Sequence, residues 1–329
     1  MSASPNHPPA PTPPLVLVFA ASDPSSGAGI QADILTLASL GCHPLTVITA
    51  LTVQDTVGVE SLHPVDAELV EQQARALLED MPVAAFKLGV LGSVENVLVV
   101  AEIVADYPEI PLVFDPVLAS GRGDEFSGED MLTAMREMLL PQTTVLTPNS
   151  LEARRLLQAE GESVLEEVDE DGETLPPPAV EPGESEADDA PEPALADCAS
   201  QLLEAGCQYV LITGTHENTP QVCNTLYGPD GVLQRDVWDR LPGSYHGSGC
   251  TLASAIAGRL AAGAGIEDAV REAQEYTWRT LAAGFRPGMG QFIPDRLFWG
   301  RPEEDDAETA TDASDGEPAV DTPAATETR

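Results

Sequence analysis

Short apolar runs that alternate with helix-like stretches constrain the fold of this chain more than any other feature of its sequence. The first run, 15–20, contains no polar residue, which is typical of a strand buried on both faces of a parallel sheet. A loop of turn residues follows, and then a helical pattern at 30–40 that Gly41 can end in the left-handed conformation. Because another strand-like run, 44–51, comes next, the order predicts right-handed crossover units.

The alternation continues through most of the chain and predicts an α/β fold, with a mostly parallel central sheet flanked by helices. Residues 54–58 are expected to form a polar crossing, and Asp66 is placed to cap the helix that follows. Two runs of alternating polarity on either side of 228–231 predict an antiparallel hairpin at the sheet edge. Further strands are expected at 84–88, 111–115, 143–146 and 209–213, and further helices at 67–78, 96–107, 128–139, 152–158, 194–205, 250–262 and 266–284.

Composition separates one folded domain from three segments that cannot bury a core. Residues 1–14 are rich in proline and have no periodicity, so we expect a disordered leader. Residues 160–197 hold 15 acidic residues and no basic one, which predicts a disordered acidic insertion at about 160–193. The end of the chain, 301–329, is expected to be an acidic disordered tail. Because the sheet pattern resumes after the insertion, a single domain at 15–300 is predicted.

Charge and cysteine usage exclude several classes of protein. The net charge of −40 argues against binding to nucleic acid or to an anionic membrane surface. The five cysteines are odd in number and lack C-x-x-C spacing, so neither a disulfide framework nor a zinc knuckle is indicated. The N-terminus has no basic segment typical of a signal peptide, and the early apolar run 15–21 is too short to span a bilayer. We therefore expect a cytoplasmic protein that binds neither nucleic acid nor membrane.

The stretch 243–252, which reads GSYHGSGCTL, predicts an anion-binding site. Its glycines leave backbone N–H groups unobstructed, and a helix starting at about Gly249 points its unpaired N–H groups and positive dipole end at the same place. Cys250 stands at this helix terminus, so we expect its pKa to lie below the reference value of about 8.5 and its thiol to be alkylated fastest. The alternative is a helix entered through a flexible loop, with Cys250 as a small buried hydrophobic residue.

Two acidic residues and one lysine are further candidates. Asp115 ends a predicted strand, and Glu152 belongs to an Asn149-x-x-Glu152 motif after the next predicted strand. Together they suit Mg²⁺, which prefers one or two carboxylates with waters and phosphate oxygens. A helix-capping box has the same spacing and is the alternative for the motif. Lys87 is the only lysine in the chain, which indicates a position that requires a compact ammonium group, unless its uniqueness is a compositional accident.

Several motifs together resemble one enzyme family. The loop after the first strand, 23–33, reads DPSSGAGIQAD, and the Gly-Ser-Gly-Cys motif at 247–250 opens a helix late in the chain. Residues 87–92 read KLGVLG. These motifs resemble the hydroxymethylpyrimidine/phosphomethylpyrimidine kinases of thiamine biosynthesis, within the ribokinase-like superfamily. The resemblance covers roughly 15–299 with one interruption.

The resemblance implies a ribokinase-like three-layer sandwich that uses ATP and Mg²⁺ to phosphorylate 4-amino-5-hydroxymethyl-2-methylpyrimidine and its monophosphate, and it implies a homodimer. In such a site the N–H groups of the glycine loop hold the charge of the transferred phosphoryl group, and the Cys250 thiolate accepts the hydroxyl proton. The implied roles are catalysis by Gly247, Ser248, Gly249 and Cys250, pyrimidine binding by Ala21, Asp33 and Gln54, ATP or phosphate binding by Asn149, Thr213 and Gly214, metal binding by Asp115 and Glu152, and a strand-end position for Lys87.

The sequence departs from the family pattern at several positions. Ala21 stands where the family usually has glycine, and its methyl group is expected to narrow the substrate pocket. Ser26 also replaces a usual glycine. Thr213 and Met289 stand where the family often has lysines that contact ATP, and Arg286 is close enough in sequence to replace one of them.

Three functions remain open at this stage. A pyridoxal kinase is a close alternative, because its substrate also carries a hydroxymethyl group on a nitrogen heterocycle. A non-catalytic pyrimidine-binding protein of the same fold is a second alternative, motivated by Thr213 and Met289. His246, within the glycine-rich stretch, is expected to have a structural role.

Overall fold

The computed structural model describes residues 12–118, 128–158 and 193–301. The chain divides into two compact units, Met1–Arg296 and Leu297–Arg329. The described part of the second unit contains a 3-10 turn, Phe298–Gly300. The predicted leader, acidic insertion and acidic tail lie almost entirely outside the described residues.

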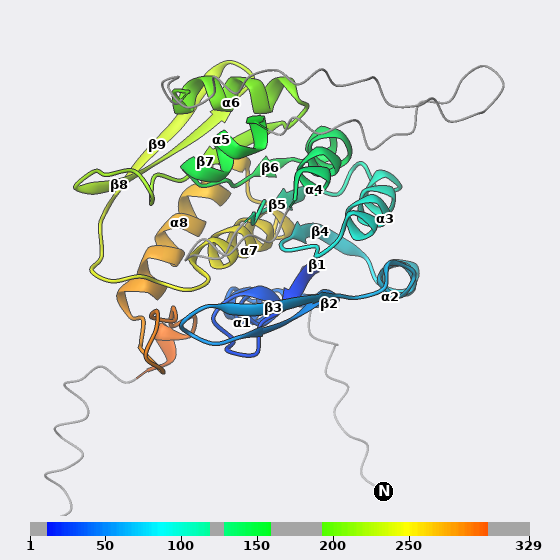
Figure 1. Ribbon diagram of the computed structural model, residues 1–329, viewed down its shortest axis with the longest axis horizontal. Helices are drawn as coiled ribbons and strands as arrows, with labels where there is room; N and C mark the ends of the chain where they lie inside the picture. The colour runs from blue at the N-terminus through cyan, green and yellow to red at the C-terminus, as the bar shows by residue number, and fades with distance from the viewer. Residues whose placement is uncertain (1–11, 119–127, 159–192, 302–329) are drawn as a thin grey trace, which may run out of the picture. The chain divides into compact units, whose positions relative to one another are not determined.

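A nine-stranded sheet forms the centre of the first unit, in the order β3-β2-β1-β4-β5-β6-β7-β8-β9 (Figure 1). The strands from β2 through β7 pair in parallel, whereas β3, β8 and β9 pair antiparallel at the two edges. The strands are β1 (Leu15–Ser22), β2 (His43–Gln54), β3 (Val59–Pro64), β4 (Val83–Leu88), β5 (Leu112–Phe114), β6 (Val145–Leu146), β7 (Tyr209–Ile212), β8 (Gln221–Gly228) and β9 (Gly231–Asp239).

Helices cover both faces of this sheet, so the predicted α/β architecture with a mostly parallel sheet is confirmed. α7 packs against α1 and α8 on one face, and α2, α3, α4, α5 and α6 lie on the other. The helices are α1 (Gly29–Ser39), α2 (Ala67–Asp80), α3 (Val94–Ala105), α4 (Glu129–Ala134), α5 (Ser150–Gln158), α6 (Leu195–Glu204), α7 (Ser248–Ala261) and α8 (Ile266–Ala282). A π-helical turn (Met135–Leu139) and a 3-10 turn (Leu140–Gln142) continue α4.

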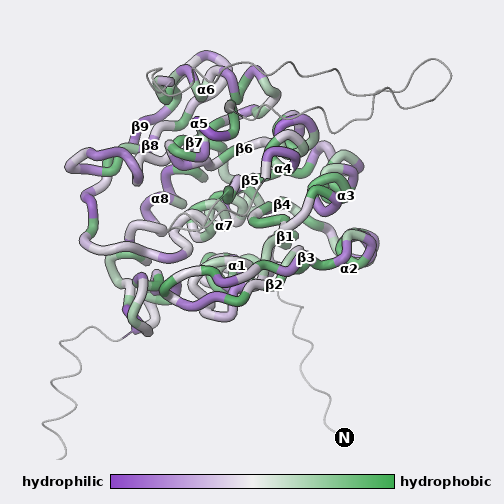
Figure 2. Tube along the Cα trace, in the orientation of Figure 1, coloured by the Kyte–Doolittle hydropathy of each residue, from purple (hydrophilic) through white to green (hydrophobic). Residues whose placement is uncertain are grey.

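The buried strand β1 shows why the sequence forms this architecture. Leu17 and Phe19 join the large apolar core that also contains residues of α2 and α3. Val16 and Val18 point to the opposite face, toward α1 and α7, and are equally buried. Both sides of β1 are therefore apolar, as a central parallel strand requires. Figure 2 shows that the central strands are hydrophobic, whereas α8 is largely hydrophilic.

Local end signals behave as the sequence predicts. Gly41 has a φ of 79°, the left-handed conformation expected after α1. The Asp66 side chain accepts hydrogen bonds from the N–H groups of Glu68 and Leu69 and so caps α2. The predicted edge hairpin is present as β8 and β9. These predictions depend on neighbours in sequence, which is why they are confirmed.

The prediction of a polar crossing at 54–58 is wrong. β2 extends to Gln54, and a tight turn closed by the Asp55 N–H and the Gly58 carbonyl leads into the antiparallel strand β3. β3 lies at the sheet edge and is exposed over much of its length, so it needs few apolar residues. Its sequence, VESLHP, therefore lacks the hydrophobic signal by which the other strands were predicted.

Candidate active site

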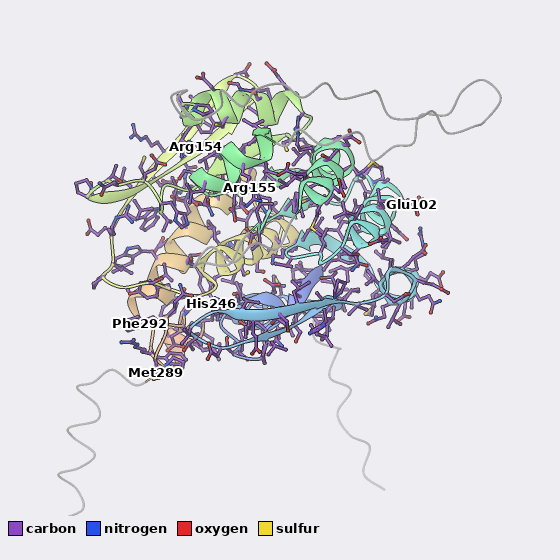
Figure 3. The ribbon with its side chains drawn as sticks, viewed as in Figure 1. Glu102, Arg154, Arg155, His246, Met289 and Phe292 are labelled. Atoms are coloured by element: carbon purple, nitrogen blue, oxygen red, sulfur yellow. The ribbon has the colours of Figure 1, made fainter. Side chains whose placement is uncertain are left out.

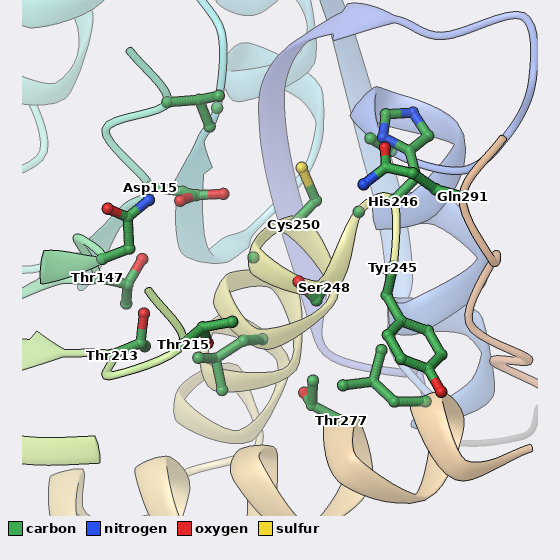
Figure 4. Close-up of a pocket in the computed structure, with 18 of the residues that line it drawn as sticks. Asp115, Thr147, Thr213, Thr215, Tyr245, His246, Ser248, Cys250, Thr277 and Gln291 are labelled. Carbon is green, nitrogen blue, oxygen red and sulfur yellow. The ribbon is translucent and has the colours of Figure 1, made fainter. Parts of the chain in front are cut away.

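A cavity of about 560 Å³ lies where the parallel strands end and α7 begins. Parallel strands bring their carboxyl ends to one edge of the sheet, and ligands of doubly wound folds bind at that edge. Figure 4 shows Ser248 and Cys250 at the start of α7, beside the space that Asp115 and Thr213 also line. The cavity therefore combines a helix N-terminus with polar groups from several strand ends.

The cavity collects all the predicted site residues except Asp33 and Gly214. The members that line it come from segments far apart in the sequence, and the fold alone brings them together. They are Ala21, Gln54, Lys87, Asp115, Asn149, Glu152, Thr213, Gly247, Ser248, Gly249 and Cys250.

Asp33 lies outside the cavity lining, where it holds Lys87. Its two carboxylate oxygens are 2.9 and 3.1 Å from the Lys87 ammonium, and the Ser254 hydroxyl donates to it at 2.6 Å. Burial alone would lower the pKa of Lys87, but its electrostatic interactions with the neighbouring acidic groups, above all Asp33, raise it above its ordinary value. Lys87 is therefore a buried cation whose position is fixed by its ion pair with Asp33.

Gly214 also lies outside the cavity lining, and it packs against β8. Its N–H group donates to the Asn224 side chain at 3.1 Å. A methyl group on Gly214 would lie 2.3 Å from the Cys223 carbonyl oxygen, so glycine is required there by close backbone approach. The amide of Gly214 is engaged within the protein.

The start of α7 has the geometry of an anion-binding loop. Gly247 has a φ of 84° and precedes the first helical residue, Ser248. A side chain on Gly247 would lie 1.9 Å from the Gly27 carbonyl oxygen, so only glycine fits. The N–H groups of the first helical turn have no acceptor within their own helix, and they face the cavity with the positive end of the dipole.

The predicted acidity of Cys250 is wrong for the protein without ligands. Burial raises the pKa of its thiol to about 12, and the carboxylates of Asp115 and Asp33 add to this increase. The Lys87 charge and a hydrogen bond from the Gly29 N–H act in the opposite direction and are outweighed. A helix N-terminus acidifies a thiol only if burial and neighbouring carboxylates do not cost more.

Asp115 and Glu152 form a pair of carboxyl groups whose ionisation is disfavoured. Burial raises the pKa of Asp115 to about 6, although Lys87 lowers it. Burial and the nearby charge of Asp115 raise the pKa of Glu152 to about 8. Asp115 Oδ2 is buried and has no hydrogen-bond partner among the described residues. Two crowded carboxylates with an unsatisfied oxygen are a donor set that a divalent cation would satisfy.

The capping box proposed as the alternative for Asn149 and Glu152 is present. The Asn149 side chain accepts hydrogen bonds from the N–H groups of Leu151 and Glu152, both at 2.9 Å. Glu152 Oε2 in turn accepts from the Asn149 N–H at 2.9 Å. The motif thus begins α5, and both residues still line the cavity. Besides this capping contact, the Glu152 carboxylate accepts a hydrogen bond from the backbone of Leu118.

Two contacts of the glycine-rich stretch were not predicted. His246 Nε2 lies 2.8 Å from Asp23 Oδ2, and although burial raises the pKa of Asp23, this contact and hydrogen bonds from Ala28 and Ser25 hold it below its ordinary value. Arg296 is also buried and contacts the same region, as described below. A buried arginine has no signature in a single sequence, because its partners lie far away along the chain.

The comparison with protein families decides to which family the chain belongs. The sequence profile of the phosphomethylpyrimidine kinase family matches residues 23–177 and 185–295. The chain belongs to the phosphomethylpyrimidine kinase family. The hydroxymethylpyrimidine/phosphomethylpyrimidine kinase of Mycobacterium tuberculosis is 37% identical over 304 residues, which cover 91% of this chain and 99% of that protein.

Solved structures agree with this assignment and confirm the predicted ribokinase-like fold. A pyridoxal kinase from Staphylococcus aureus in complex with ADP has a TM-score of 0.72 and 27% identity, over 89% of this chain and 97% of that one. A phosphomethylpyrimidine kinase from Clostridium difficile has a TM-score of 0.61 and 29% identity, over 80% and 97% of the two chains.

In this member of the phosphomethylpyrimidine kinase family, Met289 and Arg286 lie outside the cavity, whereas Thr213, which also stands at a usual lysine position, lines it. The Met289 side chain is 86% exposed (Figure 3). Arg286 donates to the carbonyl oxygens of Met289 and Gly290, and it does not line the cavity. The sequence proximity of Arg286 therefore does not place it at the site.

The far end of the cavity, toward β9 and α8, is lined by aromatic and polar side chains. Trp238 and Trp278 stack with ring centroids 6.3 Å apart, and both line the cavity. Gln274 is buried and accepts a hydrogen bond from the Trp238 indole. Arg240 also lines this end and donates to the Thr215 carbonyl oxygen at 2.8 Å.

Among the described residues, no helix combines the length and apolar character needed to cross a membrane.

Proposed function

We propose that this chain transfers the γ-phosphoryl group of ATP to hydroxymethylpyrimidine, and then a second phosphoryl group to the resulting monophosphate, in thiamine biosynthesis. The observation that carries the proposal is the anion-binding start of α7, which faces the carboxyl groups of Asp115 and Glu152 within one cavity. Membership of the phosphomethylpyrimidine kinase family and the names of its relatives support the same activity.

In the proposed reaction the bond between the γ-phosphorus and the β,γ-bridging oxygen breaks, and ADP leaves. The new bond joins phosphorus to the hydroxymethyl oxygen in the first step and to a phosphate oxygen in the second. The first step releases one proton from the hydroxyl group. The N–H groups of Ser248, Gly249 and Cys250 face the transferred group and stabilise its negative charge.

Mg²⁺ fits the same geometry, and we propose that Asp115 and Glu152 hold it. Among the described residues, no group of three or more His, Cys, Asp or Glu side chains could hold a metal ion unaided. Mg²⁺ does not need such a cage, because it is bound by one or two carboxylates together with phosphates and waters. When bound, it would neutralise phosphate charge and offset the repulsion between Asp115 and Glu152.

We propose that Cys250 receives the proton of the acceptor hydroxyl group. Its raised pKa argues against a resident thiolate in the free protein. One cause of that increase is the negative charge of Asp115, which a cation bound there would reverse. Ligand binding would thus move the Cys250 pKa toward the range that a general base requires.

Gln54 and Ala21 line the part of the cavity that we assign to the phosphoryl acceptor, the pyrimidine. An amide suits a pyrimidine because it offers both a donor and an acceptor. Asp33 would act indirectly, by fixing Lys87 in the cavity wall. We assign the remaining end, beside Trp238 and Trp278, to the nucleotide, with Asn149 and Thr213 near its phosphates.

Pyridoxal is the second candidate acceptor, because the structural resemblance to the Staphylococcus aureus pyridoxal kinase is also strong. An assay that couples ADP release to NADH oxidation should be run with hydroxymethylpyrimidine, its monophosphate, pyridoxal and no acceptor. We expect the two pyrimidines to give the highest kcat/KM. Faster turnover of pyridoxal would change the substrate assignment, and no acceptor-dependent ADP release would leave a non-catalytic binding protein.

We also propose that the catalytic unit spans residues 15–300 and that the acidic insertion at about 160–193 is dispensable for catalysis. The family profile matches 23–177 and 185–295, so the one interruption between its two matched ranges, 178–184, falls within the insertion. Deleting residues 162–190 should leave kcat within a few-fold of the value for the full chain, and loss of folded protein would oppose the proposal.

We further propose that the protein forms a homodimer. The exposed apolar residues Leu51 and Val53 on β2 support this proposal. Light scattering on the purified protein tests it.

A further inference from the structure

Two loops of the proposed active site touch backbone to backbone. The first, residues 23–29, we call the acceptor loop, and the second, residues 243–250, we call the anion loop. A methyl group on Gly27 would lie 2.2 Å from the His246 ring, and one on Gly247 would lie 1.9 Å from the Gly27 carbonyl oxygen. Neither position leaves room for a side chain, so the loops are held close by one contact with the His246 ring and one between backbones.

The guanidinium group of Arg296 joins these two loops. It donates to the carbonyl oxygens of Gly27 at 2.5 Å and Ser26 at 3.4 Å in the acceptor loop. It also donates to the Gly247 carbonyl oxygen at 3.4 Å and to the Thr251 hydroxyl at 3.0 Å. Arg296 is 2% exposed, so these contacts replace its hydration almost completely. A planar group with five donors can bridge both loops, which a lysine cannot do.

On the anion-loop side, Arg296 helps to fix one peptide group. The Gly247 carbonyl oxygen accepts from the Thr251 N–H at 3.0 Å, from the Thr251 hydroxyl at 2.8 Å and from Arg296. The same peptide carries the N–H of Ser248, the first donor of α7. Three donors on the carbonyl therefore set the direction of an N–H that faces the transferred phosphoryl group, and they polarise it.

On the acceptor-loop side, Arg296 holds a strained residue. Ser26 has a φ of 60° and is the one non-glycine residue with positive φ in the described part of the chain. Such a conformation costs of order 1–3 kcal/mol and persists only where neighbouring contacts impose it. The Asp23–His246 contact at 2.8 Å is a second connection between the same two loops.

We propose that Arg296 is a positioning residue that fixes the acceptor relative to the phosphoryl donor, an inference that rests on the proposed kinase function. Residues of both loops line the cavity, and the anion loop is the part to which we assign the phosphoryl group. Because Arg296 bonds both, it sets the distance between the attacking oxygen and phosphorus. Loosening it lets the two loops separate, and water then competes with the pyrimidine for the phosphoryl group.

The test measures, in one reaction, the ADP formed and the phosphoryl groups found on the pyrimidine. The unchanged enzyme should give a ratio close to one. In Arg296→Met, transfer to the pyrimidine should fall by about 10²-fold, as for other small misplacements of a reacting group. Hydrolysis should fall less, so the ratio of ADP to pyrimidine phosphate should rise several-fold. Arg296→Lys should give an intermediate ratio, because lysine keeps the positive charge but lacks the planar guanidinium group that bonds both loops.

A merely structural role would give a different result. Gly41→Ala lies beyond the end of α1 that is distant from the acceptor loop, outside the cavity lining, and is expected to destabilise the fold. It should lower activity only by lowering the folded fraction and leave the ratio unchanged. If Arg296→Met does not fold, Thr251→Val removes the hydroxyl that bridges Arg296 and Gly247 and should also raise the ratio. An unchanged ratio in the folded variants would overturn the proposal.

Failure of the proposed substrate would look different again. In that case the unchanged enzyme itself would form no pyrimidine phosphate. The same ratio would then be measured with pyridoxal as acceptor, where Arg296→Met should raise it for the same geometric reason.

Discussion

The ammonium nitrogen of Lys87 lies 2.9 Å from a carboxylate oxygen of Asp33, and both side chains are completely buried. The pair connects β4 to α1 at the cavity wall, which Lys87 lines, and the Ser254 hydroxyl on α7 donates to Asp33 at 2.6 Å. A buried ion pair adds little net stability, but removing one partner leaves an uncompensated charge. The two charges are therefore required together.

The first prediction concerns this pair. Lys87→Met should lower the free energy of unfolding by about 3–5 kcal/mol, because the Asp33 carboxylate is left buried without its cation. The double variant Lys87→Met/Asp33→Asn should recover most of that loss, since neither charge remains. Urea unfolding of the single and double variants measures both values. Equal losses in the single and double variants would mean that the charges are not coupled.

The second prediction concerns pH and Glu152. Its pKa is raised from 4.5 to about 8, so between these values the folded state holds a proton that the unfolded state has lost. The free energy of unfolding should therefore fall as pH rises from 5 to 8. Glu152→Gln keeps the capping box and removes this dependence, so it should be the more stable protein at pH 8 by about 1–3 kcal/mol. Thermal unfolding at pH 5 and pH 8 measures the difference.

Added Mg²⁺ provides the matched control for that comparison. If Glu152 helps to hold the cation, Mg²⁺ at pH 8 should raise the Tm of the unchanged protein more than that of Glu152→Gln. Equal shifts would separate Glu152 from the metal site without changing the expected pH dependence of stability.

The third prediction concerns substrate binding by Gln54. Gln54→Leu removes an amide from the cavity wall, and we expect a KM increase for hydroxymethylpyrimidine equivalent to about 1–3 kcal/mol. The KM for ATP should change little, because we assign the nucleotide to the opposite end of the cavity. Steady-state kinetics with each substrate varied in turn gives both values. An unchanged KM for the pyrimidine would place its ring elsewhere.

The fourth prediction concerns Cys250. Because burial raises the pKa of its thiol to about 12, iodoacetamide at pH 8 should modify the half-buried Cys223 before Cys250 in the ligand-free protein. Peptide mapping by mass spectrometry after timed alkylation identifies the order. Fastest labelling at Cys250 would show that the helix terminus outweighs burial after all.

The catalytic part of the same prediction is independent of the labelling order. Cys250→Ala should lower kcat by up to about 10²–10⁴-fold if the thiol receives the hydroxyl proton, while ATP binding persists through the backbone N–H groups. Cys250→Asp should retain substantial activity, because a carboxylate can accept the same proton. A wild-type kcat in Cys250→Ala would limit the thiol to packing.

The fifth prediction isolates a backbone effect. Gly41 has a φ of 79°, and a methyl group added to it would meet only open space, so Gly41→Ala should cost about 1–2 kcal/mol through backbone conformation alone. Gly265 has equally open space but a φ of −69°, so Gly265→Ala should change stability by about 0.5 kcal/mol or less. Chemical denaturation of the two variants compares them directly, and equal costs would contradict the conformational explanation.

The sequence by itself determined the α/β fold class, most elements and much of the site. Apolar runs and helical periodicity are local patterns, and so are the cap at Asp66 and the left-handed Gly41. The loops that carry site residues follow strand ends, and parallel strands gather their ends at one edge of the sheet. For that reason most of the predicted site residues line one cavity although only their sequence positions were known.

Tertiary structure alone decided the partners and the ionisation of these residues. Asp33 bonds Lys87 and Ser254, which are 54 and 221 positions away, and Arg296 reaches Gly27 across 269 positions. The edge strand β3 exists because β2 offers it backbone partners. The pKa of Cys250 depends on burial and on charges brought from distant segments, and these oppose the local effect of its helix terminus. Contacts and desolvation between remote segments are not encoded in any local pattern, so only the folded chain reveals them.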